Sequence, residues 1–335
     1  MIIKPEIADE TVIACLEQEY GLRIAQLTFL PLGGDLCTAV YRAVDDHRIP
    51  YFCKLRCADF DEISVELPRF LNEQGIPQIL SPVSTEGGHL WAELEPYKLI
   101  LYPFVDGTSG FDVELSDRHW ESFGVALKLI HSTILPAALS RKIPKESYSS
   151  EWRDRCRDII KRLDGGMIAD PITRDLAAYL LARRETVLDL LERAERLAQI
   201  LSSHSPEFVL CHSDIHPGNL FIEKNGDLYI VDWDYPVLAP KERDLMFIGG
   251  GQGYQGVTAQ EEELYFYRNY GPAPIDPVAM AYYRYERNIV DITVEGTRVL
   301  TETLGEQERA RSLEIITWAF LPDSTVEMAY KSDIR

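Results

Sequence analysis

The sequence has no long apolar run. Nowhere do about 18 apolar residues follow one another, which is the length that a membrane-spanning helix needs. The first ten residues, MIIKPEIADE, also lack the apolar core of a secretion signal. We therefore expect a cytoplasmic protein without a membrane partner.

Positive charge is scarce as well. The 335 residues include 34 Lys and Arg against 54 Asp and Glu, which gives a formal net charge of -20. A broad nucleic-acid-binding surface needs clustered basic side chains, so this balance argues against a nucleic-acid partner. It is compatible with a cationic small ligand, although solubility is the simpler explanation for most of these acids.

The six cysteines form no CxxC motif, and the closest two are Cys53 and Cys57. On a strand these two side chains would point the same way as Leu55 between them. We therefore interpret the cysteines as reduced core residues of a protein in a reducing compartment. The chain has no internal repeat or low-complexity tract, and it is long enough for two domains.

The first third of the chain is predicted to be rich in antiparallel strands. A short helix, Asp9–Tyr20, ends at Gly21, and a glycine turn formed by Gly33, Gly34 and Asp35 joins the first two strands. Bare backbone N–H groups in that turn could cover a phosphate chain, but a plain hairpin is the simpler interpretation. The predicted strands are Ile24–Leu30, Leu36–Val44, Tyr51–Cys57, His89–Leu94 and Lys98–Phe104.

Lys54 lies in the middle of the apolar strand Tyr51–Cys57. A lysine there must either reach solvent from an edge strand or meet an anion, and these alternatives are about even. The next predicted helix, Asp61–Asn72, contains Pro68 and offers Glu62 and Glu66 as counter-ions for Lys54.

The segment Tyr102–Gly107 is the best candidate for a domain boundary, because helical periodicity dominates after it. We expect an N-terminal domain over residues 1–105 and a mainly helical domain over residues 106–335. The longest predicted helix of the second domain is Ile172–Leu201.

The stretch Val209–Asp234 carries the strongest chemical signal. It reads VLCHSDIHPGNLFIEKNGDLYIVDWD, two apolar runs joined at Asn225-Gly226, which predicts a hairpin. Asp214, Asn219 and Asp232 should emerge at strand ends on one side. Oxygen-bearing side chains in such a place are candidates for a divalent cation site and a proton acceptor.

Two other motifs in the chain are less persuasive. Residues 251–256 match GxGxxG literally, but no strand precedes them, so we reject a dinucleotide site and expect a mobile glycine loop. His212, Asp214 and His216, with Asp232, could form a metallohydrolase cluster. That alternative leaves Asn219, the glycine turn and Lys54 without roles.

Phosphoryl transfer uses all of these pieces. It needs a cation on the nucleotide phosphates, a divalent metal with hard oxygen ligands, and a carboxylate that orients the accepting hydroxyl. Lys54 supplies the cation, Asn219 and Asp232 supply the metal ligands, and Asp214 supplies the carboxylate. The adenine would lie against the connector that contains Tyr102, Phe104 and Val105.

A cationic acceptor would also need carboxylates that do not bind the metal. Our candidates are Asp234, Glu286 and Asp291. Aromatic residues such as Tyr282, Tyr283 or Trp233 could stack on its rings, although side chains at helical spacing are more often simply packed in a core.

The motif from His212 through Asp214 and Pro217 to Asn219 resembles the catalytic loop of the protein-kinase-like superfamily. Asp232, in Ile230-Val231-Asp232-Trp233-Asp234, stands where that superfamily has its metal-binding Asp. The form without a following glycine is typical of the aminoglycoside phosphotransferase family. The resemblance implies an α+β fold of two lobes, a small antiparallel β-rich N-lobe and a larger, mainly helical C-lobe, with ATP and Mg2+ as cofactors.

Longer stretches are similar to the spectinomycin phosphotransferase branch of that family, among them residues 210–216, 239–251 and 282–287. This similarity implies phosphorylation of a ring hydroxyl of spectinomycin, a cationic aminocyclitol antibiotic. It favours Glu62 over Glu66 as the partner of Lys54. It also gives Asp244 a structural role in buttressing the catalytic loop, which His212 would help to hold.

Two further alternatives remain open. The first is a metabolic small-alcohol kinase of the same fold, such as a choline-like or methylthioribose-like kinase. The second is a non-catalytic pseudokinase that serves as a binding module, which the presence of Lys54, Asp214, Asn219 and Asp232 argues against.

Overall fold

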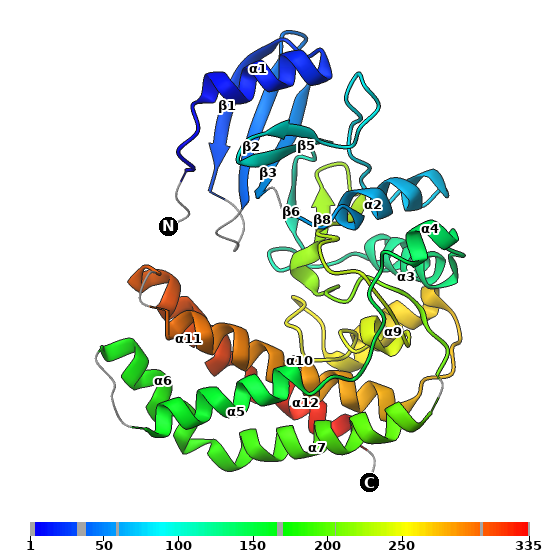
Figure 1. Cartoon of the computed structure of the whole chain (residues 1–335). Coiled ribbons are helices and arrows are strands. Elements are labelled where there is room, and N and C mark those ends of the chain that lie inside the picture. Colours follow the sequence, from blue (N-terminus) through cyan, green and yellow to red (C-terminus); the bar gives the residue numbers. More distant parts are fainter. Residues whose placement is uncertain are drawn as a thin grey trace. The chain divides into compact units, whose positions relative to one another are not determined.

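The computed structural model describes residues 4–31, 38–57, 60–165, 170–204, 206–301 and 304–333, which form two compact units (Figure 1). The first unit comprises Met1–Gly110, Ile134–Ile143 and Gly218–Pro236, and the second comprises Phe111–Thr133, Pro144–Pro217 and Val237–Arg335. The chain first passes from one unit to the other at residue 110, near the expected boundary at 105. The predicted hairpin, however, belongs to the first unit and not to the helical remainder.

A five-stranded antiparallel sheet forms the framework of the first unit, with the strand order β1-β2-β3-β5-β4. The central strand β3 pairs with β2 on one side and with β5 on the other. This excludes the edge-strand alternative for Lys54, since an edge strand has one partner only. The strands are β1 (Ile24–Leu30), β2 (Thr38–Asp45), β3 (Pro50–Cys57), β4 (Ala92–Leu94) and β5 (Tyr97–Pro103).

One face of this sheet is covered by helix α1 (Asp9–Tyr20), as Figure 1 shows. The helix ends at Gly21, whose φ of 66° is the left-handed conformation that favours glycine at a helix end. Both its bounds and its cap are confirmed. Cys53 and Leu55 point into the core beneath it and are fully buried. Because side chains alternate along a strand, Lys54 and Arg56 are directed to the opposite face.

The first unit also contains a small sheet in the order β6-β8-β9. Asn225 and Gly226 turn the chain between β8 and β9, and Gly226 has a φ of 88°, so the predicted hairpin is confirmed. The Ile230 N–H donates to the Gln78 carbonyl oxygen, which ties β9 to the segment after α2. The remaining elements of this unit are α2 (Ile63–Glu73), β6 (Gly107–Ser109), α4 (Ala137–Ser140), β8 (Leu220–Glu223) and β9 (Leu228–Ile230).

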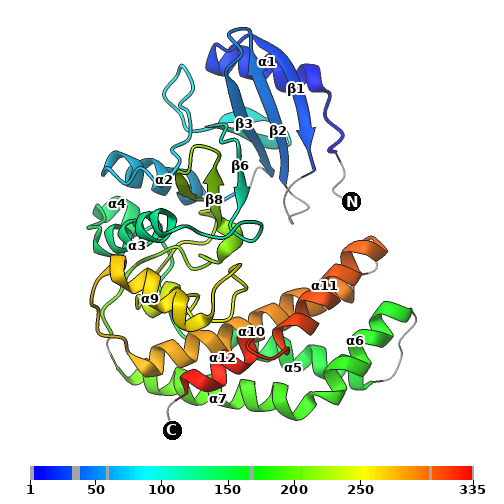
Figure 2. The same ribbon diagram turned by 180° about the vertical axis from the view of Figure 1, so that it is seen from behind.

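Helix α10 (Pro277–Val299) is the central element of the second unit. It packs against α5, α7, α11 and α12, and Figures 1 and 2 show it running among them. Its neighbours are α5 (Glu151–Asp164), α6 (Pro171–Ala182), α7 (Arg184–Ser203), α11 (Glu306–Ala319) and α12 (Thr325–Ser332).

The single helix predicted over Ile172–Leu201 is wrong. The structure has α6 and α7 instead, which meet at Arg183, where φ is -112° and ψ is 15°. The two helices both carry apolar residues at helical spacing, so periodicity alone does not reveal the break between them.

The loop that carries Asp214 follows β7 (Val209–Cys211), and β7 pairs with β10 (Val237–Ala239). Helix α3 (Asp117–Ser132) is capped by Ser116, whose hydroxyl accepts from the His119 N–H, and it packs on α9 (Ala259–Tyr270). The short α8 (Glu242–Leu245) completes the unit. It precedes the GxGxxG segment, whose glycines 251, 253 and 256 all have positive φ. No strand directly precedes these described residues, and helix α9 begins only at Ala259, after the last glycine and not within the motif as a dinucleotide site requires, so the rejection of that site is confirmed.

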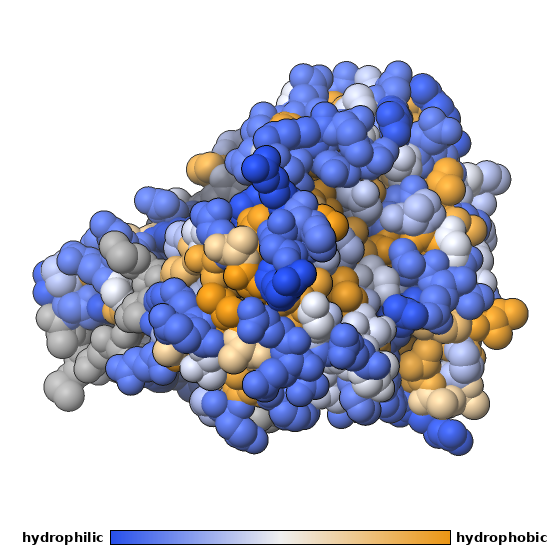
Figure 3. Space-filling view, turned by 90° about the horizontal axis from the view of Figure 1, so that it is seen from above, coloured by the Kyte–Doolittle hydropathy of each residue, from blue (hydrophilic) through white to orange (hydrophobic). Residues whose placement is uncertain are grey.

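Hydrophilic residues cover most of the face seen in Figure 3, as the large acid excess leads one to expect. Within the described ranges, no helix combines the length and the apolar character that crossing a bilayer would require. Five described cysteines, Cys15, Cys53, Cys57, Cys156 and Cys211, are free thiols, and all but Cys57 are buried.

Candidate active site

Lys54 meets anions in the first unit, as one of the two alternatives for a mid-strand lysine required. Its Nζ lies 3.4 Å from Asp234 Oδ2 and 3.5 Å from Asp232 Oδ1. Arg56, two residues along the same face of β3, donates from Nη1 to Asp234 Oδ2. We call these four residues, Lys54, Arg56, Asp232 and Asp234, the Asp234 cluster.

The formal charges of the four residues in the Asp234 cluster balance. The side chains of Lys54 and Asp234 are each 19% exposed, and that of Arg56 is 14% exposed. Burial by itself favours the neutral acid at Asp234, but the positive charges of Lys54 and Arg56 outweigh burial and hold the pKa of this carboxyl below its usual range. Asp234 is therefore an ionised group at neutral pH.

Asn219 and Asp232 are brought together by the register of the hairpin. Leu220 pairs with Ile230, and the Val231 N–H donates to the Asn219 carbonyl oxygen at 3.0 Å. Asp232 follows directly, with a φ of 66° that is unusual for a residue other than glycine. Such strained conformations are often found where a side chain has a functional role.

These two residues fit a divalent cation. Carboxylate and amide oxygens are the hard ligands that Mg2+ prefers, and two or so protein ligands are typical because Mg2+ keeps several waters. The side chain of Asp232 is 49% exposed, so it can reach a metal without first leaving a buried pair. Mg2+ would be held here by Asn219 and Asp232.

Glu62 does not lie where we expected it. Lys142 Nζ is 3.7 Å from Glu62 Oε2 and 2.7 Å from Glu66 Oε1, whereas the counter-ions of Lys54 are Asp232 and Asp234. Glu62 precedes the first residue of α2, and its side chain is 46% exposed. A pair between Lys54 and Glu62 is therefore not formed in this structure.

The other residues predicted to contact the nucleotide lie at or near the end of β5. Tyr102 pairs across the sheet with Phe52, and burial raises the pKa of its hydroxyl, with a further contribution from Asp234. The Phe104 ring lies 5.1 Å from the Arg42 guanidinium, and Val105 is half-buried in the loop that follows. The glycine turn of Gly33, Gly34 and Asp35 lies outside the described residues.

In the second unit, Asp214 follows the strand β7 and is paired with an arginine. Arg287 Nη1 lies 2.5 Å from Asp214 Oδ1, and Arg287 Nε lies 3.0 Å from Asp291 Oδ1. His216 Nε2 is 3.7 Å from Asp214 Oδ2. We call Asp214, His216, Arg287 and Asp291 the Asp214 cluster.

Burial and charge act against each other in this cluster too. Burial favours the neutral acid at Asp214, but Arg287 more than compensates and lowers the pKa of that carboxyl. Burial lowers the pKa of His216 to about 4, so its imidazole is neutral at neutral pH. At Asp291, by contrast, burial prevails over Arg287 and raises the pKa.

Asp244 holds the loop that carries Asp214. Its side chain is fully buried, and its two oxygens accept from the backbone N–H groups of His212 at 2.9 Å and Ser213 at 2.7 Å. His131 Nε2 lies 3.0 Å from Asp244 Oδ2. The Asp214 N–H in turn donates to His212 Nδ1 at 3.3 Å, so His212 lies within the same loop network.

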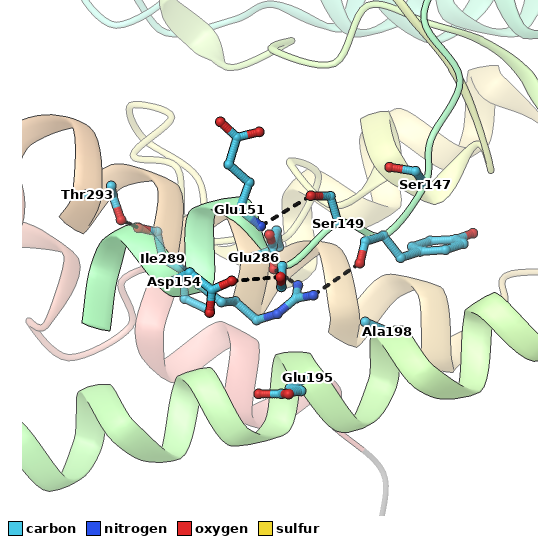
Figure 4. A network of polar contacts seen from close by, with 12 residues as sticks. Ser147, Ser149, Glu151, Asp154, Glu195, Ala198, Glu286, Ile289 and Thr293 are labelled. Carbon is cyan, nitrogen blue, oxygen red and sulfur yellow. Dashed lines mark hydrogen bonds and ion pairs between the residues drawn. The ribbon is translucent and has the colours of Figure 1, made fainter. Parts of the chain in front are cut away.

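Glu286 is buried and paired with Arg153, and Figure 4 labels it within a network of polar contacts. Arg153 Nη1 lies 2.7 Å from Glu286 Oε2, and Arg153 Nη2 donates to the Tyr148 carbonyl oxygen at 3.0 Å. Burial raises the pKa of the Glu286 carboxyl despite the charge of Arg153. Tyr282 and Tyr283, which could have stacked on a ligand, are at most 2% exposed and are packed in the core.

The metallohydrolase alternative has no support in the geometry. Within the described ranges, the group of His, Cys, Asp or Glu whose donor atoms lie within 4.8 Å of one another is His131, Cys211 and Asp244. Burial raises the pKa of the Cys211 thiol well above its usual value, and the Asp244 oxygens already accept from the N–H groups of the loop that carries Asp214. This group is therefore part of the support for the loop.

The three carboxylates predicted to bind a cationic acceptor share one property: each already contacts an arginine. Asp234 contacts Arg56, Glu286 contacts Arg153 and Asp291 contacts Arg287. Sequence reasoning named none of these arginines as site residues. The spacing of Lys54 and Arg56 on one strand could have revealed Arg56, and Arg287 lies in the stretch 282–287 that carries part of the family resemblance. Arg153 has no sequence signal beyond that of an ordinary helix residue.

Residues 28–283 match the phosphotransferase enzyme family, APH. The chain belongs to this family. Family membership makes the protein a small-molecule kinase, which sets aside the metallohydrolase and pseudokinase alternatives. A comparison with curated protein sequences gave no match.

Solved structures agree with the family assignment. A spectinomycin phosphotransferase, APH(9)-Ia, in complex with ADP and spectinomycin, is 33% identical and has a TM-score of 0.90, with coverage of 98% of this chain and 99% of that one. Its AMP-bound complex has a TM-score of 0.87 at the same identity. An amicoumacin kinase, 17% identical over 97% of this chain and 94% of its own, has a TM-score of 0.61 and so shares the fold.

These matches confirm the predicted fold class, a β-rich N-terminal part and a mainly helical C-terminal part of the protein-kinase-like type. They also support nucleotide binding, since relatives of this chain have been solved with ADP or AMP.

Proposed function

We propose that the protein transfers the γ-phosphoryl group of ATP to a hydroxyl of a cationic aminocyclitol antibiotic, with spectinomycin as the acceptor. The observation that carries this proposal is the match to spectinomycin phosphotransferase, which is 33% identical and extends over 98% of this chain. It includes α10, the helix that carries Arg287 and Asp291. The expected biological role is resistance to the antibiotic.

In the proposed reaction, Asp214 accepts a hydrogen bond from the attacking hydroxyl and orients it toward the phosphorus. The new P–O bond forms as the bond to ADP breaks, and the hydroxyl proton passes late to the Asp214 carboxylate. Lys54 neutralises phosphate charge. Bound Mg2+, held by Asn219 and Asp232, would supply further charge neutralisation for the phosphates.

The nucleotide contacts complete this proposal. The backbone of the turn at Gly33, Gly34 and Asp35 would cover the phosphates, and the adenine would lie against Tyr102, Phe104 and Val105. Glu62 has no part in holding Lys54 in this proposal, because Asp232 and Asp234 supply the counter-ions of Lys54.

Of the three carboxylates expected to bind the acceptor cation, Glu286 is the least suited to that role. Glu286 is 6% exposed, and freeing it from Arg153 would break a buried pair at a cost of about 3–5 kcal/mol. We therefore propose that Glu286 supports α10 from within the core. Asp234 and Asp291, whose side chains are 19% and 27% exposed, remain the candidates for contact with the acceptor.

A panel of acceptors with labelled ATP tests the substrate proposal. It would contain spectinomycin, an aminoglycoside, choline, ethanolamine and methylthioribose, with the Asp214→Asn variant as a control for contaminating kinases. Phosphorylation of spectinomycin with the highest kcat/KM of the panel supports the proposal. Transfer to choline, ethanolamine or methylthioribose without transfer to spectinomycin would establish the small-alcohol kinase instead.

The charge-neutral variant Asp291→Asn tests its proposed contact with the acceptor. We expect a higher KM for the acceptor and an unchanged KM for ATP. An unchanged acceptor KM would remove Asp291 from the acceptor site and leave it as a support for Arg287.

A further inference from the structure

Arg287 joins the two carboxylates of the Asp214 cluster. It donates from Nη1 to Asp214 Oδ1 at 2.5 Å and from Nε to Asp291 Oδ2 at 3.1 Å. Its guanidinium also lies 5.3 Å from the centre of the Phe247 ring, which is fully buried. A planar guanidinium with donors fixed in a fork can hold two acceptors in a set geometry, as a lysine cannot.

The surroundings of Asp214 give Arg287 a particular electrostatic role. Among the described residues, Arg287 from α10 and His212 and His216 from its own loop act on Asp214, and Asp291 acts on it from one turn further along α10. His216 is neutral at neutral pH, because burial lowers its pKa to about 4, and its ring stacks on Phe111 at 5.5 Å. Arg287 is thus a permanent positive charge in direct contact with Asp214.

Beyond Arg287, the helix supplies further negative charge. Asp291 lies one turn after Arg287 on α10, and Glu295 lies one turn beyond and acts on Asp291. Two carboxylates therefore share one guanidinium. The pair between Arg287 and Asp291 lies within one helix, so α10 holds the arginine in place before it meets the catalytic loop.

We propose that Arg287 is a positioning residue for phosphoryl transfer. It keeps the Asp214 carboxylate ionised and in one rotamer, and Asp291 in turn holds Arg287. The proposal rests on the proposed function, in which Asp214 accepts the proton of the attacking hydroxyl. The arginine lowers the basicity of Asp214. In a loose transition state the proton leaves late, so the orientation of the carboxylate matters more than its basicity.

Two variants of Arg287 separate charge from geometry. Arg287→Gln removes the charge, and we expect kcat to fall by about 10- to 100-fold, the size of a lost charged hydrogen bond. The acid limb of the pH profile of kcat/KM, where activity falls as Asp214 is protonated, should shift to higher pH by about one unit or more. Arg287→Lys keeps the charge but not the fork, so kcat should fall while the acid limb stays near that of the wild type.

The measurement is steady-state turnover between pH 4.5 and 9 with MgATP and spectinomycin, or with water as the acceptor in slow ATP hydrolysis if spectinomycin is not phosphorylated. KM for ATP should stay unchanged in both variants. An unchanged kcat and acid limb in Arg287→Gln would overturn the inference. An equal shift of the acid limb in both variants would also overturn it, because charge would then not be the cause.

Further measurements keep the test decisive. Thermal unfolding checks that each variant is folded. If Arg287→Gln does not fold, Arg287→Lys decides the question. A fall in its kcat at an unchanged KM for ATP supports the inference, and a wild-type kcat in Arg287→Lys refutes it. Asp214→Asn is measured in parallel. If Asp214→Asn keeps its turnover, the proposed function fails; if it loses turnover while both Arg287 variants behave as wild type, only the role of Arg287 fails.

Discussion

The Asp234 cluster and the Asp214 cluster solve the same electrostatic problem in different ways. Each keeps a partly buried carboxylate ionised by direct contact with a cation, and in each the pKa of that carboxyl is lowered although burial opposes this. In the Asp234 cluster, two cations come from alternate positions of one strand. In the Asp214 cluster, a single arginine comes from a helix 73 residues away along the chain.

This difference has a functional consequence. The Asp234 cluster has two cations for two carboxylates, so Lys54 can turn to phosphate while Arg56 still neutralises Asp234. The Asp214 cluster has one cation for two carboxylates and a histidine that is neutral at neutral pH. We therefore expect the loss of one cation to change the pKa of the Asp234 carboxyl less than that of the Asp214 carboxyl.

The largest effect should follow removal of the Asp214 carboxylate. In Asp214→Asn we expect kcat to fall by about 10²- to 10⁴-fold, the usual contribution of a positioned proton acceptor. Nucleotide affinity, measured by isothermal titration calorimetry, should not change, because the proposed nucleotide contacts belong to other residues. Near-normal turnover would show that the Asp214 cluster is not the catalytic one.

Removal of the buried Asp244 should mainly reduce stability. Asp244→Ala leaves two backbone N–H groups and the His131 imidazole without their acceptor, each at about 1–3 kcal/mol, so we expect a loss of about 4 kcal/mol. Asp244→Asn keeps one acceptor oxygen and should lose less. Urea unfolding of the wild type and the two variants measures this. A free energy of unfolding of Asp244→Ala equal to that of the wild type would show that Asp244 does not support the loop.

A buried carboxylate without an arginine contact gives the contrasting case. Glu262 accepts from the Gly249 N–H at 2.9 Å, and burial raises its pKa to about 7, although Arg284 is near enough to lower it. Between pH 4.5 and 7, the folded state thus keeps a proton on Glu262 that the unfolded state has released. Stability should fall by about 3 kcal/mol as the pH rises through that range.

Glu262→Gln tests this sign. The variant should lose that part of the pH dependence, so that its thermal midpoint changes less than that of the wild type between pH 4.5 and 7. A wild-type slope in the variant would mean that Glu262 is ionised throughout, like Asp214 and Asp234.

The smallest effect should come from the cations of the Asp234 cluster. Lys54→Met removes a proposed charged contact with phosphate that is worth about 1.5–3 kcal/mol, so kcat/KM for ATP should fall by about 10- to 100-fold. Arg56→Met is the matched control from the same face of β3. We expect a weaker effect from it, and equal effects in steady-state kinetics would give the two cations the same role.

Most of the elements and all of the motif residues could be predicted from local sequence. Alternation and turn residues predicted the meander, helix Asp9–Tyr20 with its glycine cap and the hairpin at Asn225-Gly226, because these depend on local backbone preferences. The closeness of Asn219 to Asp232 could be predicted as well, since the register of a short hairpin follows from its turn. The break at Arg183 was missed, because the apolar spacing is helical on both sides of it.

Tertiary structure alone decided which charges meet. Glu62 and Lys54 were expected to pair, yet Glu62 lies beside Lys142, and Lys54 meets the acids of the hairpin. Arg287 reaches Asp214 only because α10 packs beside the loop held by Asp244. The partner of a charged side chain depends on the packing of distant segments, and local sequence carries no record of that packing.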